Sequence, residues 1–149
     1  MQTKTTVSKI LEHKGSHVHS VGPEAAIVEA VRLMNQRKVG ALLVIHNNRP
    51  VGMLTERDVL LRVVDAGRDP KSTQVRAVMT ENLIVVRPTA TIEDAMRIIT
   101  QKRCRHLPVI QDDALVGLVS IGDIMRWLVR EHENYIENLL DYISGPYPS

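Results

Sequence analysis

The sequence has one cysteine, no phenylalanine and no long apolar run, and each of these scarcities excludes a class of protein. The single cysteine, Cys104, has no partner in the sequence for a disulfide, which is typical of a reducing compartment. No apolar run approaches the roughly 20 residues that a membrane-spanning helix needs, and the first residues lack the apolar core of a secretory signal. We therefore expect a cytoplasmic protein that does not act in a membrane.

Aromatic residues are also scarce, at 3% of 149 residues, and the net charge is only +2. With so few rings to stack on bases and so little positive charge, nucleic-acid binding is the weakest function that we consider. Apolar residues make up 44% and charged residues 24%, which is a globular balance with an aliphatic core. The common glycine loops for phosphate and the GxSxG and HExxH phrases do not occur. No catalytic motif points to an enzyme.

An internal repeat is the main feature that is present. Residues 23–60 align with residues 88–125 without a gap, at a constant offset of 88 − 23 = 65, and twelve of the thirty-eight pairs are identical. Seven of the remaining twenty-six pairs, counting Met, exchange one aliphatic residue for another, and this pattern argues strongly against an accidental match. The phrase "VGMLTERD" from Val51 returns as "VGLVSIGD" from Val116. Two copies of one unit predict a pseudo-twofold module with two related clefts.

Each copy has the pattern of a β-α-β-β-α unit. Pro23 or Pro88 opens a segment with helical apolar spacing, and a strand, a turn, a second strand and a second helix follow. Short strands are expected ahead of each first helix, at "HVHSV" and "LIVV". Helical turns are expected ahead of those strands, at "VSKIL" from Val7 and "VRAVM" from Val75. The fold class is therefore α/β (α+β).

The pattern also predicts how the units are divided and packed. A unit of about 60 residues buries too little surface to be stable alone, so we expect the two units to pack sheet to sheet. In the second helix of the first copy, Val59, Leu60 and Val63 are expected on one apolar side. The predicted divisions are repeat 1 at 7–66, a linker at 67–74, repeat 2 at 75–130, and an amphipathic C-terminal helix and tail at 131–149.

The second strand of each copy ends in a Thr/Ser-x-x-Asp box, at residues 55–58 and 120–123. As a helix cap, such a box stabilises a helix by about 1 kcal/mol and needs no ligand. The same geometry suits a nucleotide, because a helix N-terminus attracts phosphate and a carboxylate can accept from two ribose hydroxyls. Gly52 and Gly117 would let a flat base approach the backbone. One box alone favours a cap, whereas two boxes at matching places in a repeat favour a ligand.

These phrases resemble the CBS domain, and the chain resembles a stand-alone CBS pair, or Bateman module, like those of bacterial signal-transduction proteins. The resemblance rests on "GALLVIHNNRPVGMLTERDVL" and "RHLPVIQDDALVGLVSIGDIM" and covers residues from about 7 to 130. It implies tandem repeats that bind an adenine nucleotide (AMP, ADP, ATP or NAD, sometimes S-adenosylmethionine) in the clefts between them. It also implies a regulatory module without catalytic activity, a homodimer, and signalling to a partner protein that the sequence does not identify.

Carried over position by position, the resemblance implies two ligand sites that each draw on both repeats. Arg57 and Arg105 stand where the other copy has glycine, so we expect the first cleft to be more cationic and to prefer the more phosphorylated ligand. The first site comprises Met53, Thr55, Arg57, Asp58, Ile84, Cys104 and Arg105, with His106 also lining the cleft. The second site comprises Leu118, Ser120, Asp123, Val18, His19, Val39, Gly40 and Ala41.

Other interpretations of the same residues stay open. His13, His17 and His19 are close in sequence, but zinc needs more ligands than a strand edge provides, so a polar edge is the simpler interpretation. Cys104 has an arginine on each side and could be a reactive thiol, although a buried, inert cysteine is the simpler interpretation. If both boxes are only caps, the chain is a ligand-free adaptor. If a ligand is turned over in a cleft, the chain is a small nucleotide-processing enzyme.

Overall fold

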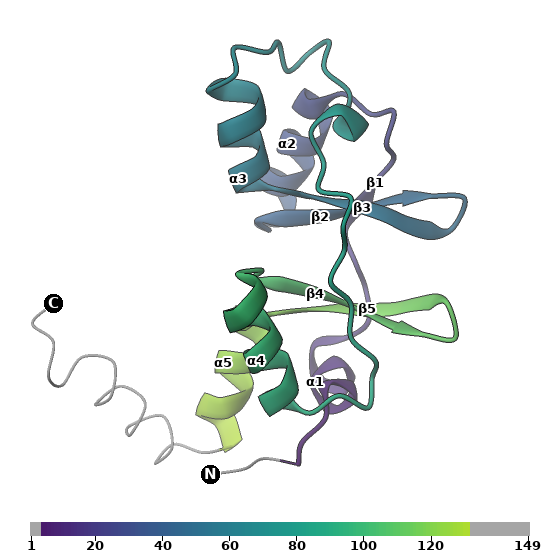
Figure 1. The fold of residues 1–149 in the computed structure, drawn as a ribbon, viewed down its shortest axis with the longest axis vertical. Coiled ribbons are helices and arrows are strands. Elements are labelled where there is room, and N and C mark those ends of the chain that lie inside the picture. Colours follow the sequence, from purple (N-terminus) through teal and green to yellow (C-terminus); the bar gives the residue numbers. More distant parts are fainter. Residues whose placement is uncertain (1–3, 132–149) are drawn as a thin grey trace, which may run out of the picture.

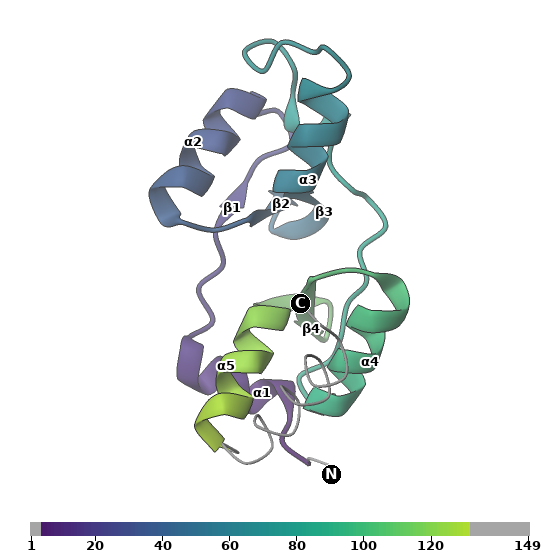
Figure 2. The same cartoon turned by 90° about the vertical axis from the view of Figure 1, so that its left-hand side faces the viewer.

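The structure is a computed structural model that describes residues 4–131, as two similar halves stacked on one another (Figures 1 and 2). Each half is a small sheet flanked by helices, so the mixed α/β fold of tandem repeats is confirmed. Within these residues, no helix is long and apolar enough to cross a membrane. The predicted C-terminal helix lies outside the described residues.

The elements are α1 (Val7–Lys14), β1 (Ser20–Val21), α2 (Ile27–Arg37), β2 (Ala41–His46), β3 (Arg49–Thr55), α3 (Glu56–Val59) with a π-helical continuation (Leu60–Val64), a 3-10 turn (Val75–Ala77), α4 (Ile92–Lys102), β4 (His106–Gln111), β5 (Ala114–Ser120) and α5 (Ile121–Glu131).

One β-hairpin organises each half. β2 pairs antiparallel with β3, and β4 pairs antiparallel with β5. Asn47 and Asn48 turn the first hairpin with φ of 52° and 63°, and Asp112 and Asp113 turn the second with φ of 51° and 63°. Two successive left-handed residues give the tight turn that matches the twist of the strands, and Asn and Asp tolerate this conformation well. The turns expected from the sequence are therefore confirmed.

The prolines do not open the first helix of each repeat, which corrects the sequence prediction. α2 and α4 begin four residues after Pro23 and Pro88. The carbonyl of Pro23 accepts a hydrogen bond from the N–H of Arg76 at 2.9 Å, and that of Pro88 accepts one from Ser8 at 3.0 Å. Each proline therefore ties the turn before the helix to a segment from elsewhere in the chain.

Two further expectations need correction. The lead-in strands are short: β1 keeps two residues parallel to β2, and "LIVV" forms only an isolated bridge between Val86 and Val109. Leu60 is 61% exposed, whereas Val63 is buried. The chain after α3 is a π-helix, whose turns are wider than those of an α-helix, so the expected apolar side does not hold there.

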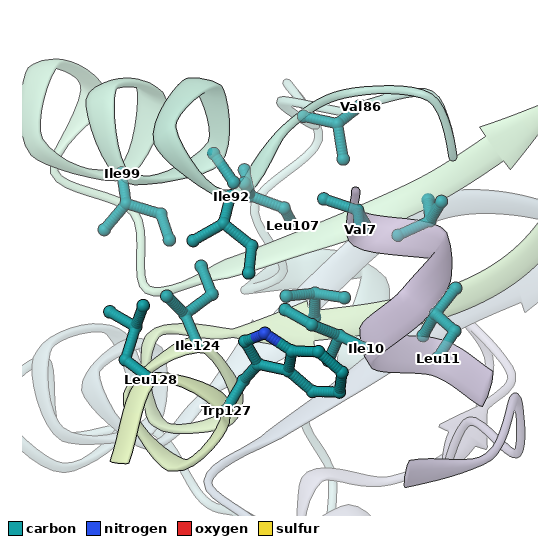
Figure 3. Packing of buried hydrophobic residues seen from close by; sticks show 13 residues of the cluster. Val7, Ile10, Leu11, Val86, Ile92, Ile99, Leu107, Ile124, Trp127 and Leu128 are labelled. Carbon is teal, nitrogen blue, oxygen red and sulfur yellow. The ribbon is translucent and has the colours of Figure 1, made fainter. Parts of the chain in front are cut away.

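The two lead-in segments exchange places between the halves. α1 opens repeat 1, yet Val7 and Leu11 are buried in the second half beside α4 and α5 (Figure 3). The turn near Val75 opens repeat 2, yet it is buried in the first half. The backbone shows the same exchange, because Val7 N–H donates to Ala90 and Val75 N–H donates to Ala25, both at 2.8 Å. Each half is therefore completed by a segment that the sequence repeat assigns to the other.

A third apolar cluster joins the halves to each other. Leu43 and Met53, from the first sheet, are buried there. Leu115 and Leu118 from β5 pack against them. The expected shared core between the sheets is confirmed, and it sets the ends of β3 and β5 beside the interface of the halves.

Candidate functional site

A cavity of about 840 Å³ lies between the halves, at the end of β3. Small-molecule sites in proteins have volumes of about 300–1,000 Å³, so the space suits a ligand of nucleotide size. The first half contributes the end of β3 and the start of α3, and the second half contributes the end of α4 and the start of β4. The lining residues are Gly40, Met53, Thr55, Glu56, Arg57, Asp58, Thr80, Asn82, Leu83, Ile84, Lys102, Arg103, Cys104, Arg105, His106 and Pro108.

The box at residues 55–58 caps α3 and presents its carboxylate to this cavity. The Asp58 N–H donates to the Thr55 hydroxyl at 3.2 Å, and the Thr55 N–H donates to Asp58 Oδ2 at 2.9 Å. Asp58 Oδ1 accepts from the Thr80 hydroxyl at 3.3 Å. Within residues 4–131, Asp58, a residue that is 8% exposed, thus accepts only from neutral donors. A carboxylate can accept about four hydrogen bonds, so Asp58 keeps acceptor capacity beside the cavity.

Basic side chains surround the same cavity. The arginines that the sequence singled out are joined there by two more cations from the end of α4. Only the carboxylates of Glu56 and Asp58 oppose them among the lining residues, and this balance favours an anionic ligand. The four basic lining residues are Arg57, Lys102, Arg103 and Arg105.

Two lining groups have a shifted pKa. Burial lowers the pKa of His106 below its ordinary value of 6.5; the Asp123 carboxylate opposes this shift, and the charges of Lys14 and Arg105 support it. Burial raises the pKa of the Cys104 thiol above its ordinary value of 9.0. The thiol is therefore protonated near neutral pH, in agreement with the interpretation of an inert cysteine.

The matching box at residues 120–123 has the same cap and a different environment. The Asp123 N–H donates to the Ser120 hydroxyl at 3.1 Å, and the Ser120 N–H donates to Asp123 Oδ2 at 2.8 Å. Lys14, at the end of α1, donates to the same Oδ2 at 2.7 Å, and Arg126 donates to Oδ1 at 2.6 Å. Burial alone would raise the pKa of Asp123, but these hydrogen bonds and the Lys14 charge hold it below 3.8.

The structure brings the first predicted set together around one cavity and places the members of the second set in several environments. Gly40, predicted for the second site, lines the large cavity instead. Val39 packs against the core of the first half, and the ring of His19 lies edge-on to that of His17 at 4.7 Å. Three others pack between the sheets: Val18, Ala41 and Leu118. The first set lines the large cavity in full: Met53, Thr55, Arg57, Asp58, Ile84, Cys104, Arg105 and His106.

Several cavity residues had not been singled out. Thr80 lies in the cavity wall because its backbone pairs with Met53 through two hydrogen bonds of 2.9 Å. Nothing local marks Thr80, since its place depends on the exchange of lead-in segments. Lys102 and Arg103 carried a usable signal, because they belong to the basic run "KRCR" that also contains Arg105.

Gly52 and Gly117, which each stand three residues before a box, have another role than the one expected. A Cβ on Gly52 would lie 2.6 Å from the Met79 sulfur, and a Cβ on Gly117 would lie 2.7 Å from a Leu11 methyl carbon. The close approach that the glycines permit is thus to the exchanged lead-in segments. The expectation that they open the strand to a flat base is wrong, because these side chains already fill the space.

Metal binding finds no support in the part of the chain that is described. No group of three or more His, Cys, Asp or Glu side chains in residues 4–131 could hold an ion. His17 and His19 face each other without a further ligand of this kind.

Comparison with known proteins matches this arrangement to one family. The family model of the CBS domain matches residues 7–65 and 75–130. The mitochondrial CBS domain-containing protein CBSX3 of Arabidopsis thaliana is 38% identical over 152 residues, which cover 96% of this chain and 74% of that protein. The crystal structure of the CBS domain NE2398 is 38% identical, with a TM-score of 0.81, and covers 84% of this chain and 98% of its own. The crystal structure of CBSX2 in complex with AMP is 28% identical, with a TM-score of 0.69, and covers 85% and 97%.

Proposed function

The chain belongs to the CBS-domain family, and on that premise we propose that it binds an adenine nucleotide in the cavity beside Asp58. The observation that supports this is one cavity of about 840 Å³ that combines a partly unused carboxylate with four Lys and Arg side chains. A carboxylate suits ribose hydroxyls and the cations suit phosphates. The related CBSX2 was crystallised with AMP, which supports the class of ligand.

The roles of the lining residues follow from their chemistry. Asp58 accepts hydrogen bonds from the ribose, and the Thr55 hydroxyl contacts ribose or phosphate. The base lies against the apolar side chains of Met53 and Ile84, which line the cavity from opposite halves. Because the ligand touches both halves, it favours one relative orientation of them, and a partner protein that binds that orientation responds to the ligand.

Thermal unfolding with AMP, ADP, ATP and NAD tests the proposal. A ligand at 100 times its dissociation constant adds about 2.7 kcal/mol to the free energy of unfolding. We expect a rise in melting temperature with at least one of these ligands, and none with adenine-free inorganic phosphate at the same concentration. Asp58→Asn keeps the shape of the cap and should abolish the rise. If no adenine compound shifts the wild-type protein, the chain is a ligand-free adaptor.

The matched variant Arg57→Ala separates phosphate recognition from ribose recognition. It removes a cation that lines the cavity and leaves Asp58 and its cap in place. We expect it to weaken ATP more than AMP, because ATP brings more phosphate charge. An equal loss for both ligands would contradict the preference for the more phosphorylated nucleotide. Ligand chromatography after incubation would reveal turnover, which we do not expect from a regulatory module.

We also propose that the chain forms a homodimer. Large apolar side chains are exposed on the π-helical continuation of α3 and on α5, and such patches are typical of interaction sites. These side chains are Leu60, Leu61, Val64 and Val129. Native mass spectrometry would report the subunit count together with any nucleotide that is retained on purification. A monomer at micromolar concentration would contradict this part of the proposal.

A further inference from the structure

We infer that Lys14 acts as a built-in substitute for a ligand in the second cleft, so that this chain binds one nucleotide and not two. The inference rests on the proposed function and adds which cleft is used and which residue closes the other. The two boxes have the same cap geometry, so the cap alone does not decide between them.

The acceptor capacity of Asp123 is largely used by the protein itself. Oδ2 accepts from the Ser120 N–H and from Lys14 Nζ, and Oδ1 accepts from Arg126. A ribose that replaced these contacts would leave two cations without their shared carboxylate. Lys14 would lose most by this, because its side chain is 33% exposed, whereas that of Arg126 is 67% exposed and is readily hydrated. Asp58 presents no such obstacle, because the Thr80 hydroxyl is its only side-chain donor besides the cap in residues 4–131.

Lys14 also occupies the edge of β5 beside the box. Its Nζ donates to the Leu118 carbonyl at 2.8 Å in addition to its bond with Asp123. In the first half, the equivalent carbonyl of Met53 accepts from the backbone N–H of Thr80 at 2.9 Å. The backbone contact of Thr80 leaves the cavity beside Asp58 open. The charged side chain of Lys14 instead reaches across to the Asp123 carboxylate.

The length of the lead-in segment explains the difference. Val7 and Val75 hold equivalent places, as do Val21 and Val86, because each pair makes the same backbone contacts with the repeats. The first segment spans 21 − 7 = 14 positions and the second spans 86 − 75 = 11, so the first has three extra residues. Three residues are almost one turn of helix. The extra turn extends α1 to Lys14, whereas the 3-10 turn near Val75 ends early and continues as extended chain along the cavity.

Isothermal titration calorimetry with AMP and with ATP tests the inference on the wild-type chain and on Lys14→Ala. We expect one nucleotide per chain for the wild type and two for the variant. Lys9→Ala is the matched control, since Lys9 lies on the same helix in an exposed pair with Glu12 and should leave the stoichiometry at one. Circular dichroism checks that each variant is folded, and Lys14→Met, which keeps most of the apolar side chain without a charge or a hydrogen-bond donor, replaces Lys14→Ala if the latter does not fold.

A second pair of variants locates the new site. Asp58→Asn alone should bind no nucleotide, whereas Asp58→Asn combined with Lys14→Ala should bind one, in the second cleft. Two nucleotides per wild-type chain would overturn the inference and leave the proposed function standing. A folded Lys14 variant that still binds one would overturn it as well. No binding by the wild-type chain would overturn the proposed function, and the inference with it.

Discussion

In the first half of the molecule Asp58 borders a cavity of about 840 Å³, whereas in the second half the equivalent Asp123 is bonded to Lys14 and Arg126. The two boxes make the same cap hydrogen bonds, and the difference at the carboxylates comes from Lys14 in the lead-in segment and from Arg126 in α5. Each lead-in packs on the opposite half, so a longer α1 changes the second cleft and leaves the first unchanged. In a repeat protein, a lead-in segment can in this way change one of two related sites without altering the cap of its box.

A second difference lies beneath the lead-in segments, at equivalent positions 62 and 127. Arg62 donates to the carbonyls of Val78 and Met79 at 3.0 and 3.2 Å, and so terminates the short turn. Trp127 instead packs against α1, with its ring 4.9 Å from that of His13 and only 5% of the residue exposed. At these two positions, the long lead-in gains apolar burial and the short one gains hydrogen bonds.

The largest predicted effect is on the free energy of unfolding, through substitutions at Trp127 and Arg62. We expect Trp127→Ala to cost about 3–5 kcal/mol, because it leaves a cavity in the aliphatic core of the second half. Arg62→Ala should cost about 1 kcal/mol, the usual net value of the hydrogen bonds that it removes. Urea unfolding followed by circular dichroism measures both, since the fluorescence of the single tryptophan is lost in the first variant. Equal costs would show that the two lead-ins are held in the same way.

Substitutions at Gly52 and Gly117 test further how the two lead-in segments pack. We expect Gly52→Ala to cost about 1–3 kcal/mol, because the added Cβ meets the Met79 sulfur at 2.6 Å and the Thr80 backbone oxygen at 3.0 Å. Gly117→Ala should cost less, because its nearest contacts are all side-chain atoms of Leu11, which can move. Thermal melts measure both costs.

The nucleotide provides a second measurement on the same variants. Displacement of Thr80 disturbs the hydrogen bond to Asp58, so only the change at Gly52 should also weaken the ligand. Gly22→Ala is the matched control, since nothing lies within 4 Å of the added Cβ. A greater cost at Gly117 than at Gly52 would show that the backbone contact at Thr80 does not matter.

The sequence predicted those features that local chemistry decides. The Asn and Asp pairs specified the hairpin turns, and the Thr/Ser-x-x-Asp boxes specified the caps. The family resemblance also placed the box at residues 55–58 in one cleft with Cys104 and Arg105, and all of these line the large cavity. Within the box, only Glu56 had not been singled out. Whether these residues bind a nucleotide stays a prediction.

The sequence did not predict those features that distant packing decides. The pattern of α1 shows an apolar side but does not say which half buries it. The place of Lys14 beside Asp123 follows from that packing alone, and so does the place of Thr80 beside Asp58. The role of the glycines was misjudged for the same reason, since Leu11 and Met79 reach them from exchanged segments.

Acid should weaken the contact by which Lys14 holds Asp123. The folded pKa of Asp123 lies below its ordinary value of 3.8, so its stabilisation is present above that pH and is lost as the pH falls through the folded pKa. We expect Lys14→Ala to cost about 1 kcal/mol at pH 7, because the pair is partly exposed, and less as the pH falls below 3.8. Urea unfolding at a series of pH values measures this, with Lys9→Ala as the control. A cost that does not change with pH would show that the ion pair contributes nothing.

The smallest effect concerns the caps of the first helices. Thr91 caps α4 through a box with Asp94, whereas the equivalent Ala26 of α2 has no side-chain cap. Ala26 already has the extended backbone of a cap, with φ of −74° and ψ of 148°, and Glu29 stands at the position that completes a capping box. Ala26→Thr should therefore stabilise the protein by about 0.5 kcal/mol, and the mirror change Thr91→Ala should destabilise it by about 1 kcal/mol. Thermal melts of both variants and of the double variant measure these shifts. A loss of stability in Ala26→Thr would mean that the larger side chain clashes where Ala26 bridges to Gln74. The first half would then need alanine at this position to pack against the lead-in segment that contains Val75.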